Sequence, residues 1–144
     1  MTGAAGQFGI LASGAYVPRW RIERRTITDA MGWSRGRVRP GKGTRSFANW
    51  DEDSLTLAVE AGRVALGVDG GEGPGRLVLA STSLPFADRS NAGIAREALH
   101  LPPGTRLLES TGSRRAATSA LIDALQAGEP TLLCASDCVD AQPG

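Results

Sequence analysis

Two patterns of apolar residues alternate along most of this chain. Short apolar runs between polar or glycine-rich breaks are typical of fully buried strands, and they occupy residues 76–81, 106–110 and 131–135. Between them, apolar residues recur at helical spacing. Because strand and helix alternate with short connections, we predict an α/β fold with a mostly parallel sheet and helices packed on it.

The helix boundaries carry local signals. The acidic run 51–53 supplies an N-cap and first-turn acids, which suit the positive end of a helix, and Gly67 is a plausible stop. Ser90 or Asn91 is expected to cap a second helix that runs to about residue 99. A third helix is predicted over 114–126, with Ala116, Ala117, Ala120, Leu121, Ala124 and Leu125 facing inward.

The first third of the chain is less regular. We predict a first strand over 8–17, which ends before Pro18 because proline has no N–H for a ladder. A short helix over 26–31 is closed by Gly32. Residues 34–46 are expected to form a basic Gly/Arg loop, because their glycines and Pro40 interrupt regular structure.

Composition limits the class of protein. The chain has 144 residues, 41% of them apolar and 22% charged, which fits one folded domain and argues against disorder. A net charge of +1 gives no general reason to expect a nucleic-acid or membrane partner. We expect a cytoplasmic, reducing setting, because there is no apolar signal core and two cysteines make no disulfide framework. Cys134 and Cys138 lack the further ligands of a zinc site, so no metal is expected.

Charge is concentrated in one region. Nine Lys and Arg residues lie between Arg19 and Arg45, opposed only by Glu23 and Asp29. Such a patch can bind phosphate groups, and a solvated surface or a subunit contact is the alternative. The aromatic residues in or beside it can stack bases, but no nucleic-acid-binding motif accompanies them, so we expect no nucleic-acid partner.

The stretch 109–121 predicts a strand end, a turn of small residues and a helix start. In open α/β folds such a corner faces the ligand crevice, and the helix N-terminus presents free N–H groups and partial positive charge. Arg114 and Arg115 are therefore candidates for holding an anion, and an ion pair with Glu109 or with an acidic residue of a partner is the structural alternative. Asp137 and Asp140 follow the last strand and are expected to border the crevice or a subunit contact.

Four stretches resemble the N-terminal half of thiolase-superfamily enzymes, and most of all 3-hydroxy-3-methylglutaryl-CoA synthases. They are residues 14–22, 51–61, 81–87 and 118–121, in the order of that family. The resemblance implies a fold of two similar halves, usually in a dimer, of which residues 1–144 supply the first while the C-terminal half is absent. It also implies carbon–carbon bond formation or cleavage on acyl thioesters of coenzyme A or of a carrier protein.

The resemblance departs from the family at its catalytic positions. The nucleophilic cysteine of the family corresponds to Arg114, or to Ser113 if the alignment slides by one residue. A guanidinium stays protonated, and a serine needs an adjacent base. The general-base glutamate corresponds to Thr82. The catalytic histidine belongs to the other half, and the lone His100 matches no catalytic position.

Two functions follow as hypotheses. The chain is an incomplete synthase-like enzyme part that works only with a second half, and aldol or retro-aldol chemistry stays open to it. Alternatively, it is a pseudoenzyme, a non-catalytic acyl-CoA-binding or scaffold subunit. In either case, coenzyme A phosphates would contact the residues Arg114, Arg115, Arg39, Lys42 and Arg45. Half of a two-part fold exposes an apolar face, so we expect a homodimer or a hetero-complex with a C-terminal half.

Overall fold

The computed structural model describes residues 9–32, 41–67 and 73–138. They divide into two compact units. The first, called here the body, comprises Met1–Tyr16 and Asp53–Gly144, and the second, the arm, comprises Val17–Glu52. Each is described by itself.

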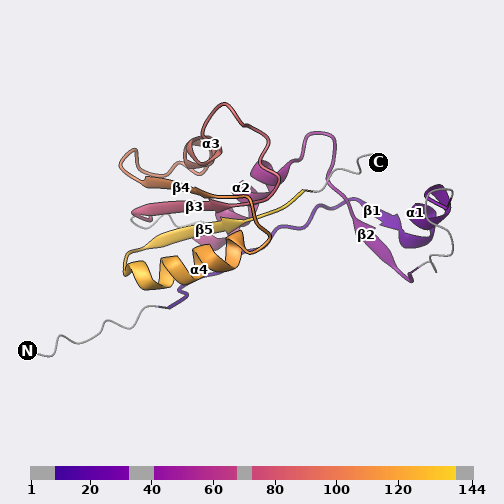
Figure 1. Ribbon diagram of the computed structural model, residues 1–144, viewed down its shortest axis with the longest axis horizontal. Coiled ribbons are helices and arrows are strands. Elements are labelled where there is room, and N and C mark those ends of the chain that lie inside the picture. The colour runs from indigo at the N-terminus through magenta and orange to yellow at the C-terminus, as the bar shows by residue number, and fades with distance from the viewer. Residues whose placement is uncertain (1–8, 33–40, 68–72, 139–144) are drawn as a thin grey trace, which may run out of the picture. The chain divides into compact units, whose positions relative to one another are not determined.

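A three-stranded parallel sheet forms the centre of the body, as the sequence predicts. Its strand order is β4-β3-β5, with β4 at Arg106–Ser110, β3 at Arg76–Ala80 and β5 at Thr131–Ala135. The three strands are level at both ends, since Ala80 lies opposite both Ser110 and Ala135. The carboxyl ends of all three strands therefore meet at one edge of the sheet (Figure 1).

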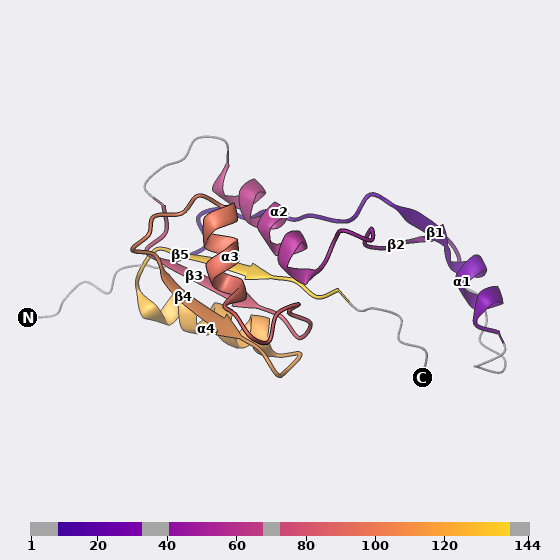
Figure 2. The same ribbon diagram turned by 90° about the horizontal axis from the view of Figure 1, so that it is seen from above.

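Helices cover both faces of this sheet. Helices α2 (Ser54–Leu66) and α3 (Asn91–Ala98) lie on one face, and α4 (Ala116–Ala127) lies on the other (Figures 1 and 2). The central strand alternates between the two layers. Leu77 and Leu79 pack with α2 and α3, whereas Val78 and Ala80 pack against α4. All four are at most 2% exposed, so β3 is buried on both faces.

The predicted helix caps form with side-chain hydrogen bonds. Asp53 accepts from the backbone N–H of Thr56 at 2.7 Å, and the Thr56 hydroxyl accepts from the backbone N–H of Asp53 at 2.8 Å. This reciprocal pair is a capping box. Of the two predicted caps of α3, Ser90 is the one observed, because its Oγ accepts from the N–H of Gly93 at 3.0 Å.

The predicted strand over 8–17 is wrong for its described residues, since 9–17 pair with no described strand. The reason lies in Gly14, whose backbone packs on α2. A Cβ atom there would lie 2.4 Å from the Ala65 nitrogen and 2.6 Å from the Ala61 oxygen. At Gly14 the chain therefore lies against a helix, where its backbone has no ladder partner.

In the arm, two short strands pair where the sequence predicts only loop. Strand β1 (Arg21–Glu23) is antiparallel to β2 (Thr44–Ser46), and α1 (Arg24–Ala30) follows β1 directly. The loop prediction is thus wrong for 44–46, while residues 34–40 lie outside the described residues. The glycine and proline residues near β2 led to a loop prediction, because β2 is stabilised by a partner strand about twenty residues away in the chain. The predicted short helix is confirmed and begins two residues earlier than expected.

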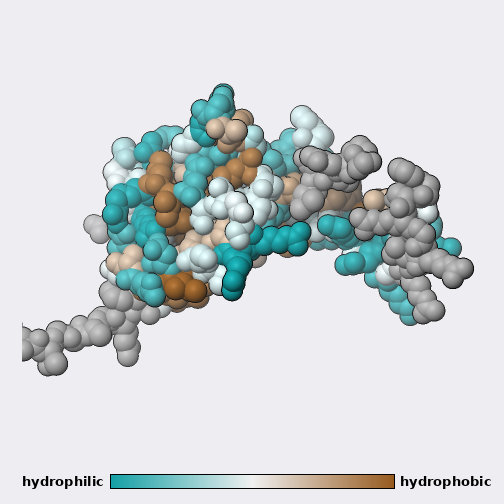
Figure 3. Space-filling view, in the orientation of Figure 1, coloured by the Kyte–Doolittle hydropathy of each residue, from teal (hydrophilic) through white to brown (hydrophobic). Residues whose placement is uncertain are grey.

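The predicted inward face of α4 is wrong at its two leucines. Ala116 and Ala120 are buried against the sheet, but Leu121 and Leu125 are 37% and 38% exposed. Ile122 beside them is 52% exposed. Small alanines let α4 approach the sheet closely, which turns the larger side chains outward. The outer side of α4 therefore presents exposed apolar side chains. Figure 3 shows brown, apolar patches on the surface of the body.

Replacing Gly14 with alanine tests the contact with α2. The atoms that a Cβ would meet belong to the helix backbone and cannot turn aside. We expect Gly14→Ala to lower the free energy of unfolding by about 1–3 kcal/mol in urea denaturation. Gly9→Ala is the matched control, because no atom lies within 4 Å of a Cβ built there. Equal midpoints for the two variants would show that Gly14 does not pack on α2.

Candidate functional site

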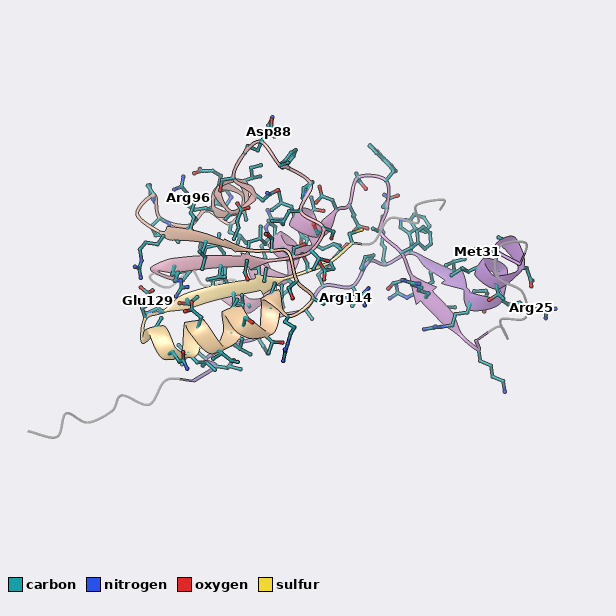
Figure 4. All side chains as sticks on the ribbon, viewed as in Figure 1. Arg25, Met31, Asp88, Arg96, Arg114 and Glu129 are labelled. Carbon is teal, nitrogen blue, oxygen red and sulfur yellow. The ribbon has the colours of Figure 1, made fainter. Side chains whose placement is uncertain are left out.

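A small hollow opens where the carboxyl ends of β3 and β5 meet the start of α4. Its volume is about 180 Å³. Figure 4 shows Arg114 at this end of the sheet, on the loop that leads into α4. Alanines supply the apolar part of the lining, and the polar part consists of Ser81, Thr82, Ser113, Arg114, Ser136 and Asp137.

Asp137 is the best-anchored polar group of the hollow. Its Oδ1 accepts from the backbone N–H of Thr82 at 2.6 Å, from the Thr82 hydroxyl at 2.9 Å and from the Ser81 hydroxyl at 3.2 Å. Partial burial by itself raises the pKa of Asp137, but these hydrogen bonds and the nearby Arg114 charge together hold that pKa below its usual value. Asp137 is therefore an ionised carboxylate at neutral pH.

Hydroxyl groups tie the loops after β3 and β5 to each other and to α2. The Ser83 hydroxyl accepts from the backbone N–H of Cys138 at 2.9 Å. Ser54, which is 1% exposed at the start of α2, donates its hydroxyl proton to the Ser83 carbonyl at 2.5 Å. The Ser136 hydroxyl in turn donates to the Ser54 carbonyl. These bonds satisfy the buried polar groups and fix the backbone that positions Asp137.

Ser113 lies in the turn that leads into α4. Its Oγ accepts from the N–H of Arg115 at 3.1 Å, and its carbonyl accepts from the N–H of Ala116 at 2.9 Å. The regular helix begins at Ala116, two residues later than predicted, and its N-cap residue is Arg115, without a side-chain capping bond. Among the described residues, no base is hydrogen-bonded to the Ser113 hydroxyl. The described geometry thus contains no activated serine nucleophile.

The predicted ion pair with Glu109 does not form. The Glu109 carboxylate accepts from the backbone N–H of Ala92 at 2.9 Å, the Ser90 hydroxyl at 3.0 Å and the Asn91 amide at 3.3 Å. Partial burial raises the pKa of Glu109, but these donors outweigh it and the pKa is lowered. Glu109 therefore anchors the start of α3. In the described part of the chain, Arg114 forms no ion pair.

The structure assembles some of the predicted site residues and leaves others apart. The hollow brings together Thr82, Ser113 and Arg114, whose roles stay predictions. Arg115 does not line it. Lys42 and Arg45 are exposed on the arm, whereas Arg39 and Asp140 lie outside the described residues. Asp137, expected at the crevice border, lines the hollow. The supporting role of Ser54 and Ser136 was missed, although serines directly after buried strands and at a helix start were a usable signal.

A larger hollow of about 490 Å³ lies at the opposite, amino-terminal end of the sheet. Its charged groups neutralise one another. Arg106 forms an ion pair with Glu129, and Arg76 pairs with Asp123 and lies 3.7 Å from Glu129. Figure 4 shows Glu129 at the end of the sheet away from Arg114. Because its cations already have partners, this hollow is the weaker candidate for binding an anionic ligand.

The cysteine of β5 is not a reactive thiol. Cys134 is 4% exposed, and burial raises the pKa of its thiol to about 11, so it carries no thiolate near neutral pH. No group of three potential metal ligands is found in the described parts of the chain. Nor, within those parts, does any helix have the length and apolar character to cross a membrane.

Comparison with known proteins identifies relatives of this chain. No protein-family model matches it. It is 34% identical over 145 residues to the hydroxymethylglutaryl-CoA synthase of Aeropyrum pernix, covering 94% of this chain and 40% of that protein. The chain thus spans about two fifths of the length of this curated relative.

Solved structures share the fold. The crystal structure of a 3-oxoacyl-(acyl-carrier-protein) synthase III superposes with a TM-score of 0.73 and 17% identity, covering 91% of this chain and 42% of that one. A structure of Xanthomonas campestris OleA with bound lauric acid and lauroyl-CoA has a TM-score of 0.66 and 18% identity, with coverage of 83% and 39%. Both are similar to this chain over most of its length.

Substituting Glu109 tests its role at the start of α3. We expect Glu109→Gln to lower the free energy of unfolding by about 1 kcal/mol at pH 7, because a carboxylate that accepts from a helix N-terminus is lost. The lowered pKa makes this stabilisation present above the unfolded-state pKa and lost as the pH falls through the folded-state pKa. The difference from the parent protein should therefore shrink in acid.

Glu97→Gln serves as the control for this substitution. Its carboxylate pairs only with the neighbouring Arg96 among the described residues and is 75% exposed. Urea midpoints measured from pH 7 down to pH 3 compare the two variants. A loss at Glu109 that is independent of pH would argue that its charge does not hold α3.

Proposed function

We propose that this chain, a hydroxymethylglutaryl-CoA synthase-like member of the thiolase superfamily, binds the acyl end of a coenzyme A thioester in the hollow between β3, β5 and α4. The observation that carries the proposal is Arg114, which lines the hollow and forms no ion pair within the described residues. Its guanidinium can donate to a carbonyl or carboxylate oxygen of the ligand.

The size of the hollow supports a small acyl group. Its volume of about 180 Å³ is enough for a short acyl group. The known use of acyl-CoA by the relatives, including the lauroyl-CoA bound to one structural neighbour, supports the thioester as the ligand class.

We propose that binding is non-covalent. Covalent acyl transfer needs a nucleophile that is deprotonated or paired with a base. In the body, the buried Cys134 thiol keeps its proton, and the Ser113 hydroxyl accepts from the Arg115 N–H in the turn before α4, with no described base bonded to it. Arg114 itself cannot attack an acyl carbon. The hollow thus has groups that orient a thioester and, among the described residues, lacks a group to accept its acyl chain.

A non-catalytic acyl-CoA-binding or scaffold subunit is therefore the function favoured here. The alternative is part of a synthase or aldolase, in which a second half supplies the base and the carbon–carbon bond is made or broken between them. The chain spans about two fifths of the length of its relatives, and we propose that the groups missing from the hollow come from a second half. The exposed apolar side chains Leu121, Ile122 and Leu125 mark the outer side of α4 as the proposed contact, in a homodimer or with a C-terminal half.

Titration calorimetry of the purified chain with acetyl-CoA and hydroxymethylglutaryl-CoA tests the binding role. We expect Arg114→Ala to weaken binding by about 10- to 100-fold, the value of a charge-assisted hydrogen bond. Arg115→Ala is the matched control, since Arg115 is the adjacent cation and does not line the hollow. If neither thioester binds, or if both variants lose affinity equally, the hollow is not the acyl site.

A condensation assay separates the two candidate roles. Acetyl-CoA and acetoacetyl-CoA are incubated with the chain, alone and with a candidate second half. Binding without turnover in both cases supports the scaffold role. Turnover that needs both parts would establish the enzyme role instead.

A further inference from the structure

We infer that the arm carries a docking surface for an acidic segment of another protein. The surface consists of the aromatic side chains of Trp20, Phe47 and Trp50 with arginines beside them, and it is called here the aromatic surface. The inference goes beyond the proposed function and does not depend on acyl-CoA. It follows from the exposure of these rings and from the charges that surround them.

Backbone pairing brings Trp20 and Phe47 opposite each other. Strands β1 and β2 pair in an antiparallel register in which Arg21 faces Ser46 (Figure 1). The N–H of Phe47 donates to the carbonyl of Trp20 at 3.2 Å, which extends this ladder by one residue. Because side chains alternate between the two faces of a strand, Trp20 and Phe47 lie on the same face of the ribbon as Arg45.

The three rings are open to solvent. Trp20 is 50% exposed, Phe47 is 44% exposed and Trp50 is 92% exposed. Trp50 lies in a closed turn, in which the Asn49 N–H donates to the Glu52 carboxylate at 2.7 Å and the Glu52 N–H donates to the Asn49 carbonyl at 3.0 Å. Aromatic residues contribute much of the binding energy of interfaces, since each buries a large area. Three exposed rings in a unit of this size therefore mark a binding surface.

The cations beside the rings have no acidic partner within the described residues. The Arg19 guanidinium lies 5.9 Å from the centre of the Trp20 ring, and Arg45 shares the face of that ring. Neither arginine forms an ion pair in the described part of the chain. The whole arm has nine Lys and Arg residues and four Asp and Glu residues. A partner that covers the rings must therefore place acidic groups near these arginines, because like charges across an interface are costly.

The placement of the cations favours a protein over a nucleic-acid strand or a lipid surface. Both of those ligands need a row of cations on the same side as the rings. Arg21, however, alternates to the face opposite Trp20, and its guanidinium donates to the carbonyls of Pro18 and Trp20. An apolar centre with a few charges at its rim is instead the usual anatomy of a protein–protein interface.

A peptide of alternating Glu and Tyr residues is the probe for this surface, because it carries both acids and rings. Calorimetry measures its affinity for the full chain, beside a Glu–Ser peptide and a Lys–Tyr peptide of the same length. We expect the Glu–Tyr peptide to bind about tenfold tighter than either of the others, since each of those lacks one feature of the match. Trp50→Ala and Arg45→Glu should each weaken its binding about tenfold.

Two variants serve as matched controls. Leu11→Ala removes an apolar side chain of similar exposure from the body, where Leu11 is 98% exposed. Arg25→Glu makes the same change of charge on α1, where Arg25 pairs with Asp29. Both variants should keep the affinity of the parent chain. Circular dichroism of all four variants verifies a native fold, and a side chain as exposed as Trp50 can be truncated without disturbing the packing.

Three results would overturn the inference. The Glu–Tyr peptide fails to bind, or the Glu–Ser peptide binds as tightly. Arg25→Glu weakens binding as much as Arg45→Glu, which would assign the attraction to net charge alone. Sedimentation shows a dimer that Trp50→Ala dissociates, which would mean that a second copy of this chain covers the rings. Acetyl-CoA binding by Trp50→Ala should equal that of the parent chain, so that failure of this inference leaves the proposed function untouched.

Discussion

The burial of β3 on both faces is the constraint on which the rest of the body depends. A strand with apolar side chains toward α2 and α3 and toward α4 can exist only at the centre of a sheet. That position gives β3 parallel neighbours on each side, in register from Arg76 to Ala80. All three strands then end at the same level. The polar residues that directly follow the strands therefore lie side by side.

The polar character of the hollow beside α4 follows from this placement of polar residues after β3 and β5. Serines and a threonine follow β3, and Ser136 and Asp137 follow β5, so each loop supplies hydrogen-bonding partners for the other. The network is anchored on Ser54, whose place is fixed by the capping box at the start of α2. Packing thus determines the backbone, and the backbone determines how the Asp137 carboxylate is held.

Elements with local signals were predictable from the sequence, and elements that depend on distant partners were not. The three sheet strands and the acidic cap of α2 carry their own apolar runs and capping residues. The predicted strand at residues 9–17 was wrong because Gly14 contacts a helix nearly fifty residues away, and β2 was missed because only β1 makes it a strand. The exposed leucines of α4 were misassigned because helical periodicity does not say which of two apolar sides faces the sheet.

The same distinction holds for the site. The family resemblance indicated the positions 82, 113 and 114, which the fold gathers around one hollow. The part played by Asp137 could not be predicted, since its partners Ser81 and Thr82 lie more than fifty residues before it in the chain.

The sequence predicts that Arg114, or Ser113 beside it, stands where the family has a nucleophilic cysteine, and an arginine at that place implies different electrostatics as well as different reactivity. A helix N-terminus stabilises a thiolate, whereas it repels a guanidinium. An arginine at the start of α4 therefore needs a compensating anion. Asp137 is the charged group that Arg114 influences across the hollow, and the ionised state of Asp137 is in turn favoured by that cation. The Arg114 charge and the hydrogen bonds from Ser81 and Thr82 thus act in the same direction on Asp137, and both depend on the loops that the parallel strands bring together.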